Sequence, residues 1–340
     1  INMSQSAIKN IYKLGFPWET EDPFLFSVHH EDFYPKGNEN LGPITSLEGR
    51  RMGNDFTVKD GFRMYHGQTV PGFPAHPHRG FETVTVVRKG LVDHADSAGG
   101  AGRYGNGDVQ WMTAGKGLQH SEMFPLLNQN KENPFELFQI WINLPAANKF
   151  VEPTFKMIWS EQQAKEEFID SNGNKTKIEV VAGRINKKTP PPPPNSWAQN
   201  PDNHVAIWNI KIEANGEFKL PKAVAGLNRN LYFYKGDTLQ IENEKIDVYK
   251  GIKLDSNQDV VIQNGNTAAH LVLLQGKPIG EPVVRYGPFV MNSNEEVEQA
   301  MKDYQNTQFG GWPWERTDKN HGPTKGRFAK HIDGELEEKN

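Results

Sequence analysis

The stretch that says most about the fold is GFPAHPHRGFETV, residues 72–84, in which His76 and His78 stand two positions apart. On a β-strand, side chains two positions apart point to the same face and lie about 6.5–7 Å apart along the backbone. If the strand continues through the stretch, His76, His78 and Glu82 all face inward. Two imidazoles placed in this way can bind one ion, so the sequence predicts a metal site on a strand.

A second stretch, GNGDVQWMTAGKGLQHSEM, covers residues 105–123. A glycine turn leads into a strand, then into another glycine turn, and finally to His120 and Glu122 at the same spacing of two. This spacing predicts a second pair of ligands that face inward on a strand. The two stretches together predict one ion held by three imidazoles and a carboxylate.

The residue types narrow the metal. The chain has no cysteine, so thiolate ligands are excluded and the ligands must come from His, Asp, Glu or backbone oxygen. Three imidazoles and a carboxylate, with room for one or two further ligands, suit Fe(II), Mn, Co, Ni, Cu or Zn better than Ca or Mg. Glu82, Gln110 and Gln139 are candidates to orient the ligand rings. We interpret His66 and His94 as structural residues.

The rest of the sequence reads as an all-β protein. Its 32 glycines and 23 prolines separate many short apolar runs, a pattern typical of barrels and sandwiches. The predicted strands cover residues 81–87, 108–113, 137–143, 178–182, 205–213, 230–234 and 268–274. Helical patterns occur at 160–168 and at 294–306, where Ser293 or Asn294 can cap the start.

A chain of 340 residues is expected to form two domains. Five consecutive prolines, Pro190–Pro194, must adopt polyproline II, and we interpret this run as a spacer between two barrels. The expected division is therefore a metal-binding barrel at residues 1–189 and a second barrel at 190–310. The polar residues 311–340 are expected to form a surface tail, which Trp312 and Trp314 could pin to a barrel.

Composition excludes some classes of function. The net charge is −4 and the isoelectric point is about 6.3, which disfavours direct binding of nucleic acid. The sequence has no apolar run long enough to span a membrane. Residues 1–13 lack the pattern of a secretory signal. We therefore expect a cytoplasmic location, and also a nuclear one if the source is eukaryotic.

Several of these segments resemble the pirin family of the cupin superfamily. They are residues 72–84, residues 107–115 with His120–Met123, and, near the C-terminus, Glu281–Val284 with Gly287–Asn292; the family order holds from about Asp22 to Gly310. The resemblance implies a bicupin, that is, two tandem antiparallel cupin (jelly-roll) β-barrels with a mononuclear iron in the first. It implies the metal ligands His76, His78, His120 and Glu122.

Two features qualify this ligand set. Most metal cupins take their carboxylate from the position of Glu82, whereas pirins take it two places after the last histidine. We favour Glu122, because its neighbour His120 already faces the ion; Glu82 is then an outer residue or a proton acceptor. The second half of the chain has no His-x-His pair, only His204 and His270 far apart. Its barrel is therefore expected to carry no equivalent metal.

The resemblance also implies two classes of function. The first is an Fe(II)-dependent quercetin 2,3-dioxygenase that cleaves a flavonol, with Glu122 or Glu82 accepting the flavonol hydroxyl proton. The alternative is a non-enzymatic, iron-dependent regulator that binds a protein partner such as a transcription factor. A third hypothesis is a zinc or nickel cupin that acts on another small substrate. We favour the enzyme.

Overall fold

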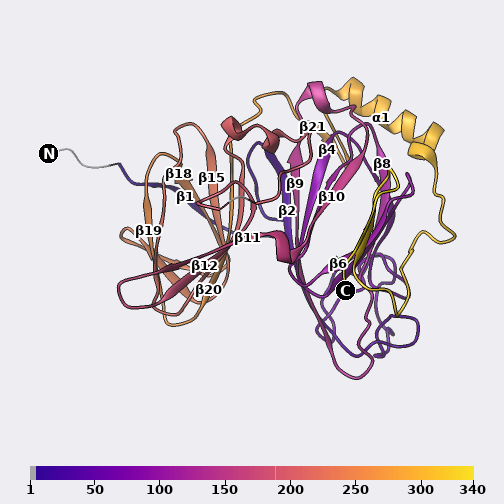
Figure 1. Ribbon diagram of the computed structural model, residues 1–340, viewed down its shortest axis with the longest axis horizontal. Helices are drawn as coiled ribbons and strands as arrows, with labels where there is room; N and C mark the ends of the chain where they lie inside the picture. Colours follow the sequence, from indigo (N-terminus) through magenta and orange to yellow (C-terminus); the bar gives the residue numbers. More distant parts are fainter. Residues whose placement is uncertain (1–4, 188) are drawn as a thin grey trace. The chain divides into compact units, whose positions relative to one another are not determined.

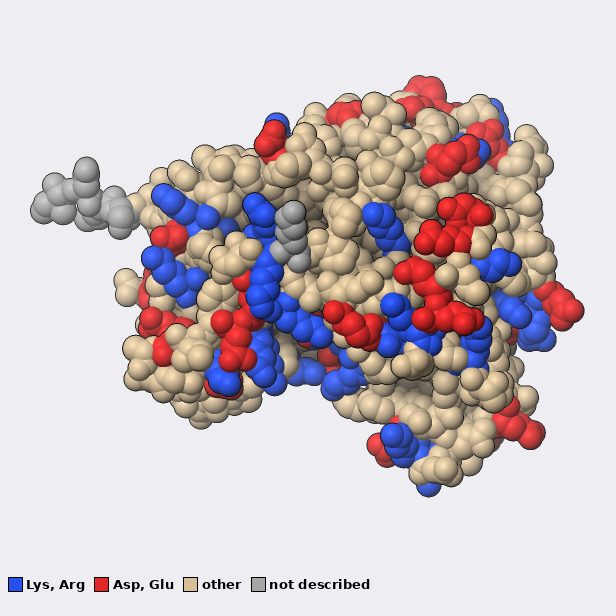
Figure 2. Space-filling view, in the orientation of Figure 1, with Lys and Arg blue, Asp and Glu red and all other residues tan. Residues whose placement is uncertain are grey.

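The computed structural model describes residues 5–187 and 189–340, whose regular secondary structure is mostly β-strand (Figure 1). The chain divides into two compact units. Unit 1 contains residues 1–27 and 161–280, and unit 2 contains residues 28–160 and 281–340. On the face drawn in Figure 2, basic and acidic side chains are intermixed.

Unit 1 consists of two antiparallel sheets, with strand orders β1-β18-β15-β20-β13-β12-β11 and β14-β19-β16-β17. Alternate residues of its strands, such as Leu231 and Phe233 on β15 and their partners Leu273 and Leu271 on β20, form a buried apolar core. The strands are β1 (Ile8–Lys13), β11 (Ala164–Ile169), β12 (Lys175–Ala182), β13 (Ala206–Ile212), β14 (Glu217–Leu220), β15 (Asn228–Lys235), β16 (Thr238–Ile241), β17 (Glu244–Asp247), β18 (Lys250–Asp255), β19 (Val260–Asn264) and β20 (Ala269–Gly276).

Unit 2 has sheets of order β10-β7-β4-β9-β2 and β24-β23-β6-β5-β8-β3, and a separate hairpin, β21-β22. Apolar side chains such as Val92, Tyr104 and Met112 fill its core. The strands are β2 (Phe24–Tyr34), within which the unit boundary falls, β3 (Gly72–His78), β4 (Phe81–Lys89), β5 (Leu91–Asp96), β6 (Ala101–Gly105), β7 (Val109–Thr113), β8 (Leu118–Met123), β9 (Asn133–Asn143), β10 (Thr154–Ile158), β21 (Val284–Tyr286), β22 (Phe289–Met291), β23 (Phe328–Lys330) and β24 (Leu336–Glu338). The predicted fold of two antiparallel cupin β-barrels is confirmed.

One of the two predicted helices is present. α1 (Asn294–Thr307) begins after Ser293, whose hydroxyl accepts a hydrogen bond from the Glu296 amide. No helix among the described residues is long and apolar enough to cross a membrane. Short 3₁₀ turns occur at Ala146–Asn148, Ser160–Gln162, Trp197–Gln199, Pro201–Asn203 and Gln308–Gly310.

The helix predicted at residues 160–168 is wrong. A 3₁₀ turn at Ser160–Gln162 is followed by strand β11, which pairs with β12 along its whole length. Ala164 and Glu166 are buried while Lys165 and Glu167 are exposed, which is the period of an edge strand. Pairing with the sheet has therefore overridden the local helical preference.

The domain boundaries expected from the sequence also need correction. β11 and β12 precede the proline run and β13 follows it, yet all three are neighbours in one sheet of unit 1. Pro190–Pro194 therefore connects two strands of the same unit and is not a spacer between barrels. The N-terminal strand β1 pairs with β18 of unit 1, and residues 281–310 belong to unit 2.

Residues 311–340 are part of unit 2 rather than a surface tail. β23 pairs with β6, β24 pairs with β23, and Phe328 and Ala329 are buried. The buried guanidinium of Arg103, paired with Asp93, donates hydrogen bonds to the carbonyls of Gly322 and Lys325. Polar composition hid this segment, because its buried apolar anchor is short and many of its other contacts are made by polar side chains through hydrogen bonds, ion pairs and ring contacts.

Candidate metal centre

The three histidines of the two sequence motifs meet between β3 and β8. These strands are antiparallel neighbours, and His76 lies directly opposite His120. Directly paired residues of an antiparallel pair project to the same face. The Nε2 atoms of His78 and His120 are 3.1 Å apart, and one ring nitrogen from each of His76, His78 and His120 lies within 4.8 Å of the others. The three histidines could therefore hold one metal ion.

The carboxylate of Glu122 lies beside these rings. Its Oε2 atom is 3.6 Å from Nε2 of His120 and 3.8 Å from Nε2 of His76. The Gln139 amide donates to both carboxylate oxygens, at 3.0 and 3.2 Å, and the Thr85 hydroxyl donates to Oε1 at 3.3 Å. These donated hydrogen bonds fix the orientation of the buried carboxylate.

These separations fit a first-row transition metal. With metal–ligand distances of about 2.1 Å, neighbouring ligand atoms of an octahedral or tetrahedral ion lie roughly 3.0–3.4 Å apart. The observed separations of 3.1, 3.6 and 3.8 Å need only small side-chain movements to reach that range. The donor set of nitrogen and carboxylate oxygen suits such ions better than Ca or Mg.

Hydrogen bonding and burial keep the rings in the form that binds metal. Nδ1 of His76 is 2.8 Å from the carbonyl oxygen of Pro74, which can only accept, so Nδ1 carries the proton and the Nε2 lone pair faces the cluster. Burial lowers the pKa of His76 and holds the pKa values of His78 and His120 well below the ordinary value. Neutral imidazole is the state that coordinates a metal.

The cluster is not equally accessible on all sides. The His76 side chain is 29% exposed, whereas that of His120 is fully buried. Within the described residues, the Nδ1 atoms of His78 and His120 have no hydrogen-bond partner. An approaching ligand would therefore meet the cluster on the His76 side.

Glu82 does not join the cluster. Gly80 has a positive φ of 93°, and the turn at Arg79–Gly80 ends β3 and begins β4, so the alternation of side chains does not carry over. On β4 the Thr85 side chain contacts Glu122, so Glu82, three positions away, faces the other side of the strand. Oε2 of Glu82 accepts a hydrogen bond from the Thr113 hydroxyl at 2.5 Å. The prediction that Glu82 faces inward with the histidines is wrong.

The candidates for orienting the rings are also placed differently. Gln139 contacts Glu122 rather than a ring, and the Gln110 amide oxygen accepts from the Tyr104 hydroxyl at 3.4 Å. His94, interpreted as structural, is buried and lies 2.8 Å from Asp96, with its ring 5.5 Å from that of His120. His66 contacts the carbonyl of Gly53.

Sequence reasoning missed Thr85, Trp141 and Arg285. The ring of Trp141 is 5.4 Å from that of His78, and its indole N–H donates to Gln139. The guanidinium of Arg285 lies 4.6 Å from the centroid of the Trp141 ring. A signal existed for Thr85, because two threonines alternate with valines at residues 83–87 and so mark a polar face on an apolar strand. Arg285 lies on a distant hairpin, so no local pattern could place it.

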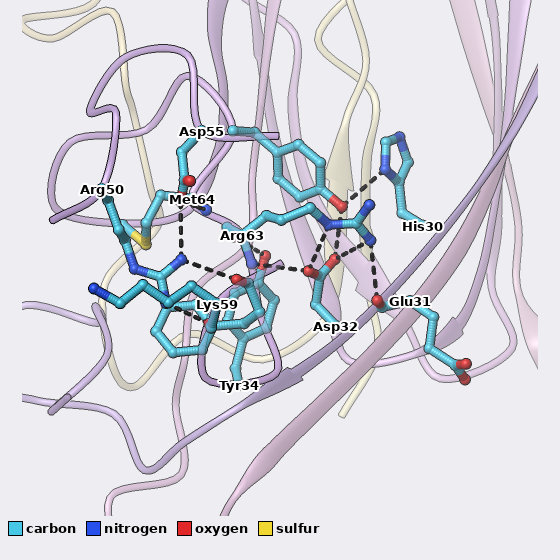
Figure 3. A network of polar contacts seen from close by, with 11 residues as sticks. His30, Glu31, Asp32, Tyr34, Arg50, Asp55, Lys59, Arg63 and Met64 are labelled. Atoms are coloured by element: carbon cyan, nitrogen blue, oxygen red, sulfur yellow. Dashed lines mark hydrogen bonds and ion pairs between the residues drawn. The ribbon is translucent and has the colours of Figure 1, made fainter. Parts of the chain in front are cut away.

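Figure 3 shows a network of polar contacts in unit 2 that includes His30, Asp32 and Arg63. Asp32 accepts hydrogen bonds from Arg63 and from the Tyr65 hydroxyl, which in turn is 2.9 Å from Nδ1 of His30. Burial lowers the pKa of His30 to about 3, so this ring is neutral and Nδ1 donates to Tyr65. The Tyr65 ring packs 5.1 Å from Phe73, whose ring lies 6.4 Å from His76.

Known proteins resemble this chain in sequence and in fold. The sequence profile named Pirin matches residues 37–142, and the profile of the pirin C-terminal cupin domain matches residues 207–310. A Pseudomonas aeruginosa protein whose name assigns it provisionally as a quercetin 2,3-dioxygenase is 37% identical over 69% of this chain and 79% of its own length. Human pirin is 32% identical over 73% of this chain and 81% of its own.

A solved structure gives the same fold. The crystal structure of a quercetin 2,3-dioxygenase from Acinetobacter baumannii superimposes with a TM-score of 0.69, over 89% of this chain and 98% of that one, at 23% identity.

Proposed function

The chain belongs to the pirin family, and from this premise we propose that it is an Fe(II)-dependent dioxygenase that acts on a flavonol such as quercetin. The observation that carries the proposal is the convergence of three neutral imidazoles and one oriented carboxylate on a single point with an accessible side at His76. Mn, Co, Ni, Cu and Zn are the alternative ions for this donor set.

In this proposal His76, His78, His120 and Glu122 hold the ion. The donor set carries one negative charge, so a bound dication keeps a net positive charge that attracts a chelating oxygen. Iron supplies Lewis acidity toward substrate oxygens and redox chemistry toward O2.

In this proposal, side chains of the protein accept the substrate proton and limit the access of water. The Thr85 and Gln139 donors hold Oε1 of Glu122, and the shared Gln139 amide leaves Oε2 turned toward the rings. We assign the Glu122 carboxylate as the acceptor of the flavonol hydroxyl proton. Trp141 and Phe81, whose rings pack 4.3 Å apart, limit the access of water from the His78 side.

The test begins with protein purified without added metal, whose metal content is measured by elemental analysis. The protein is then loaded with Fe(II) without oxygen, mixed with quercetin, and exposed to O2. We expect one ion per chain, and oxygen consumption that matches the loss of quercetin. The His120→Ala variant, carried through the same steps, is the control for unbound iron.

Iron-loaded protein that leaves quercetin untouched would refute this function and favour the iron-dependent regulator. That alternative uses the same ligands but requires no turnover. It predicts that a protein partner is captured differently by the ferrous and ferric forms, and equal capture would reject redox switching.

A further inference from the structure

Arg285 places a positive charge close to the cluster of His76, His78 and His120. It lies on β21, is exposed, and its guanidinium carbon is 4.6 Å from the centroid of the Trp141 ring, which is a cation–π contact. Trp141 also contacts the histidine cluster, since its ring lies 5.4 Å from the ring of His78. One aromatic side chain therefore separates the guanidinium from a metal-binding ring.

The electrostatic effect of Arg285 reaches the cluster. Trp141 and His78 are both buried, the Trp141 ring lies 4.6 Å from the guanidinium carbon, and it lies 5.4 Å from the His78 ring, so water screens the Arg285 charge only partly. A positive field at this place favours a negative charge on a ligand. Because a guanidinium stays protonated at any physiological pH, this field is permanent.

The hairpin that carries Arg285 is fixed to the strand that carries the ligands. The backbone N–H of Arg79, the residue after His78, donates to the Pro288 carbonyl, and the N–H of Val290 donates to the Arg79 carbonyl. The ammonium of Lys149 bridges the carbonyls of Gly80 and Val290. These bonds tie β21–β22 to the end of β3, so Arg285 keeps its position relative to His78.

We propose that Arg285 makes the metal site selective for anionic ligands, such as ionised phenols or carboxylates that bind the ion through oxygen. The proposal rests on the metal site of the proposed function and adds the charge of the ligand it accepts. A dication with Glu122 leaves a net charge of plus one among the neutral rings, and Arg285 raises the local charge to plus two. Anionic ligands therefore gain Coulomb attraction from both charges, while a neutral ligand binds the ion without a comparable gain from Arg285.

The experiment compares an anionic with a neutral probe on the same ion. Wild-type protein is loaded with iron, oxidised, and titrated with azide and separately with imidazole, with binding followed by absorption spectroscopy. We expect Arg285→Gln to weaken azide binding roughly three- to tenfold, the size expected when one unit charge is removed from near a partly exposed site. Imidazole binding should change less than about twofold, since a neutral probe has little Coulomb interaction with the guanidinium.

Two further variants separate charge from structure. Arg285→Lys keeps the charge and should retain most of the azide affinity. Lys131→Gln removes one exposed charge from the loop between β8 and β9, beside the Lys89 end of β4 and away from Phe81, and should change neither titration. Rising salt should weaken azide binding more in the wild type than in Arg285→Gln.

Unchanged azide affinity in Arg285→Gln, or an equal loss for azide and imidazole, would overturn the proposal, because the first outcome denies the charge effect and the second shows a structural role. Both outcomes leave the proposed metal site intact. Wild-type protein that retains no iron on loading would instead refute the metal site, and the anion selectivity with it.

Discussion

Replacing Glu122 or Glu82 by glutamine distinguishes the proposed metal ligand from a carboxylate that lies on the other face of β4. Glu122→Gln should remove most of the bound metal, and Glu82→Gln should leave the metal in place. Both changes keep the size of the side chain and remove one negative charge, so each variant is the control for the other. The placement of the two carboxylates on opposite faces of β4 is the basis of the prediction.

The expected magnitude for Glu122→Gln follows from charge and hydrogen bonding. A dication and a carboxylate whose charges are centred about 4 Å apart attract each other by about 8 kcal/mol at an effective dielectric constant of 20. If only a quarter of this attraction is lost, the metal dissociation constant rises about 30-fold. The new amide also meets the N–H groups of Gln139, which donate to both oxygens of the native carboxylate, so at least one hydrogen bond is lost.

The assay is metal stoichiometry after dialysis against a chelator, measured together with flavonol turnover. We expect Glu122→Gln to lose iron and turnover together. Glu82→Gln should retain iron, and any change in affinity should stay below the roughly 10- to 100-fold range of residues that hydrogen-bond directly to a ligand. An empty Glu82→Gln and a fully loaded Glu122→Gln would refute the reasoning, because the carboxylate ligand would then be the one found in most metal cupins.

Three further predictions concern the same unit. His120→Ala should abolish metal binding yet leave a folded protein, since a truncation worth about 2 kcal/mol lowers the melting temperature of a unit this size by roughly 4–8 °C; global unfolding at room temperature, seen by circular dichroism, would contradict this. The pKa of His30 is about 3 in the folded protein, whereas an ordinary histidine in an unfolded chain has a pKa of 6.5. As the pH falls below 6.5, the unfolded chain therefore takes up a proton that the folded chain does not. Its contribution to stability is therefore lost between pH 6.5 and 3, by up to about 5 kcal/mol, and urea unfolding of His30→Gln should show a weaker pH dependence in this window than the wild type. Lys149→Met should lower the free energy of unfolding by about 1–3 kcal/mol, because it leaves the acceptors on Gly80, Asn143 and Val290 without their shared donor; a loss within the error of a denaturant titration would show that the buried charge costs as much as its hydrogen bonds return.

The histidines could be predicted because the shared face within each ligand pair depends on local strand geometry. His76 and His78 need only one extended stretch to share a face, and so do His120 and Glu122, and the glycine turns mark where these strands start. The same rule failed for Glu82 because a turn at Gly80 lies between it and His78. Periodicity is informative only within one strand, and the sequence does not show where a strand of this length ends.

Other features depended on contacts between distant segments. Residues 160–168 combine Ala, Lys and Glu in a way that favours a helix, but an open sheet edge at β12 made a strand more stable. The proline run has the right stiffness for a spacer, yet strands on both sides of it pair in one sheet. Residues 311–340 are held by hydrogen bonds from Arg103 to two of their backbone carbonyls and by an ion pair between Arg327 and Asp108. No apolar pattern in the sequence predicts such contacts.

The path of the chain explains why the sequence motif at Gly287–Asn292 accompanies the one at residues 72–84. Unit 1 is formed largely by residues 161–280, but the chain then returns to unit 2, where the backbone of Pro288 and Val290 bonds to Arg79, the residue that follows His78. Lys149 bridges the carbonyls of Gly80 and Val290 at the same junction. The end of the strand that carries His76 and His78 is thus held by residues about 200 positions later in the sequence. The metal-binding unit is therefore discontinuous, and a fragment that ends before residue 281 would lack both the support for His78 and the guanidinium of Arg285. A correct ligand geometry thus requires the chain on both sides of residues 161–280, although all four proposed ligands lie before this segment.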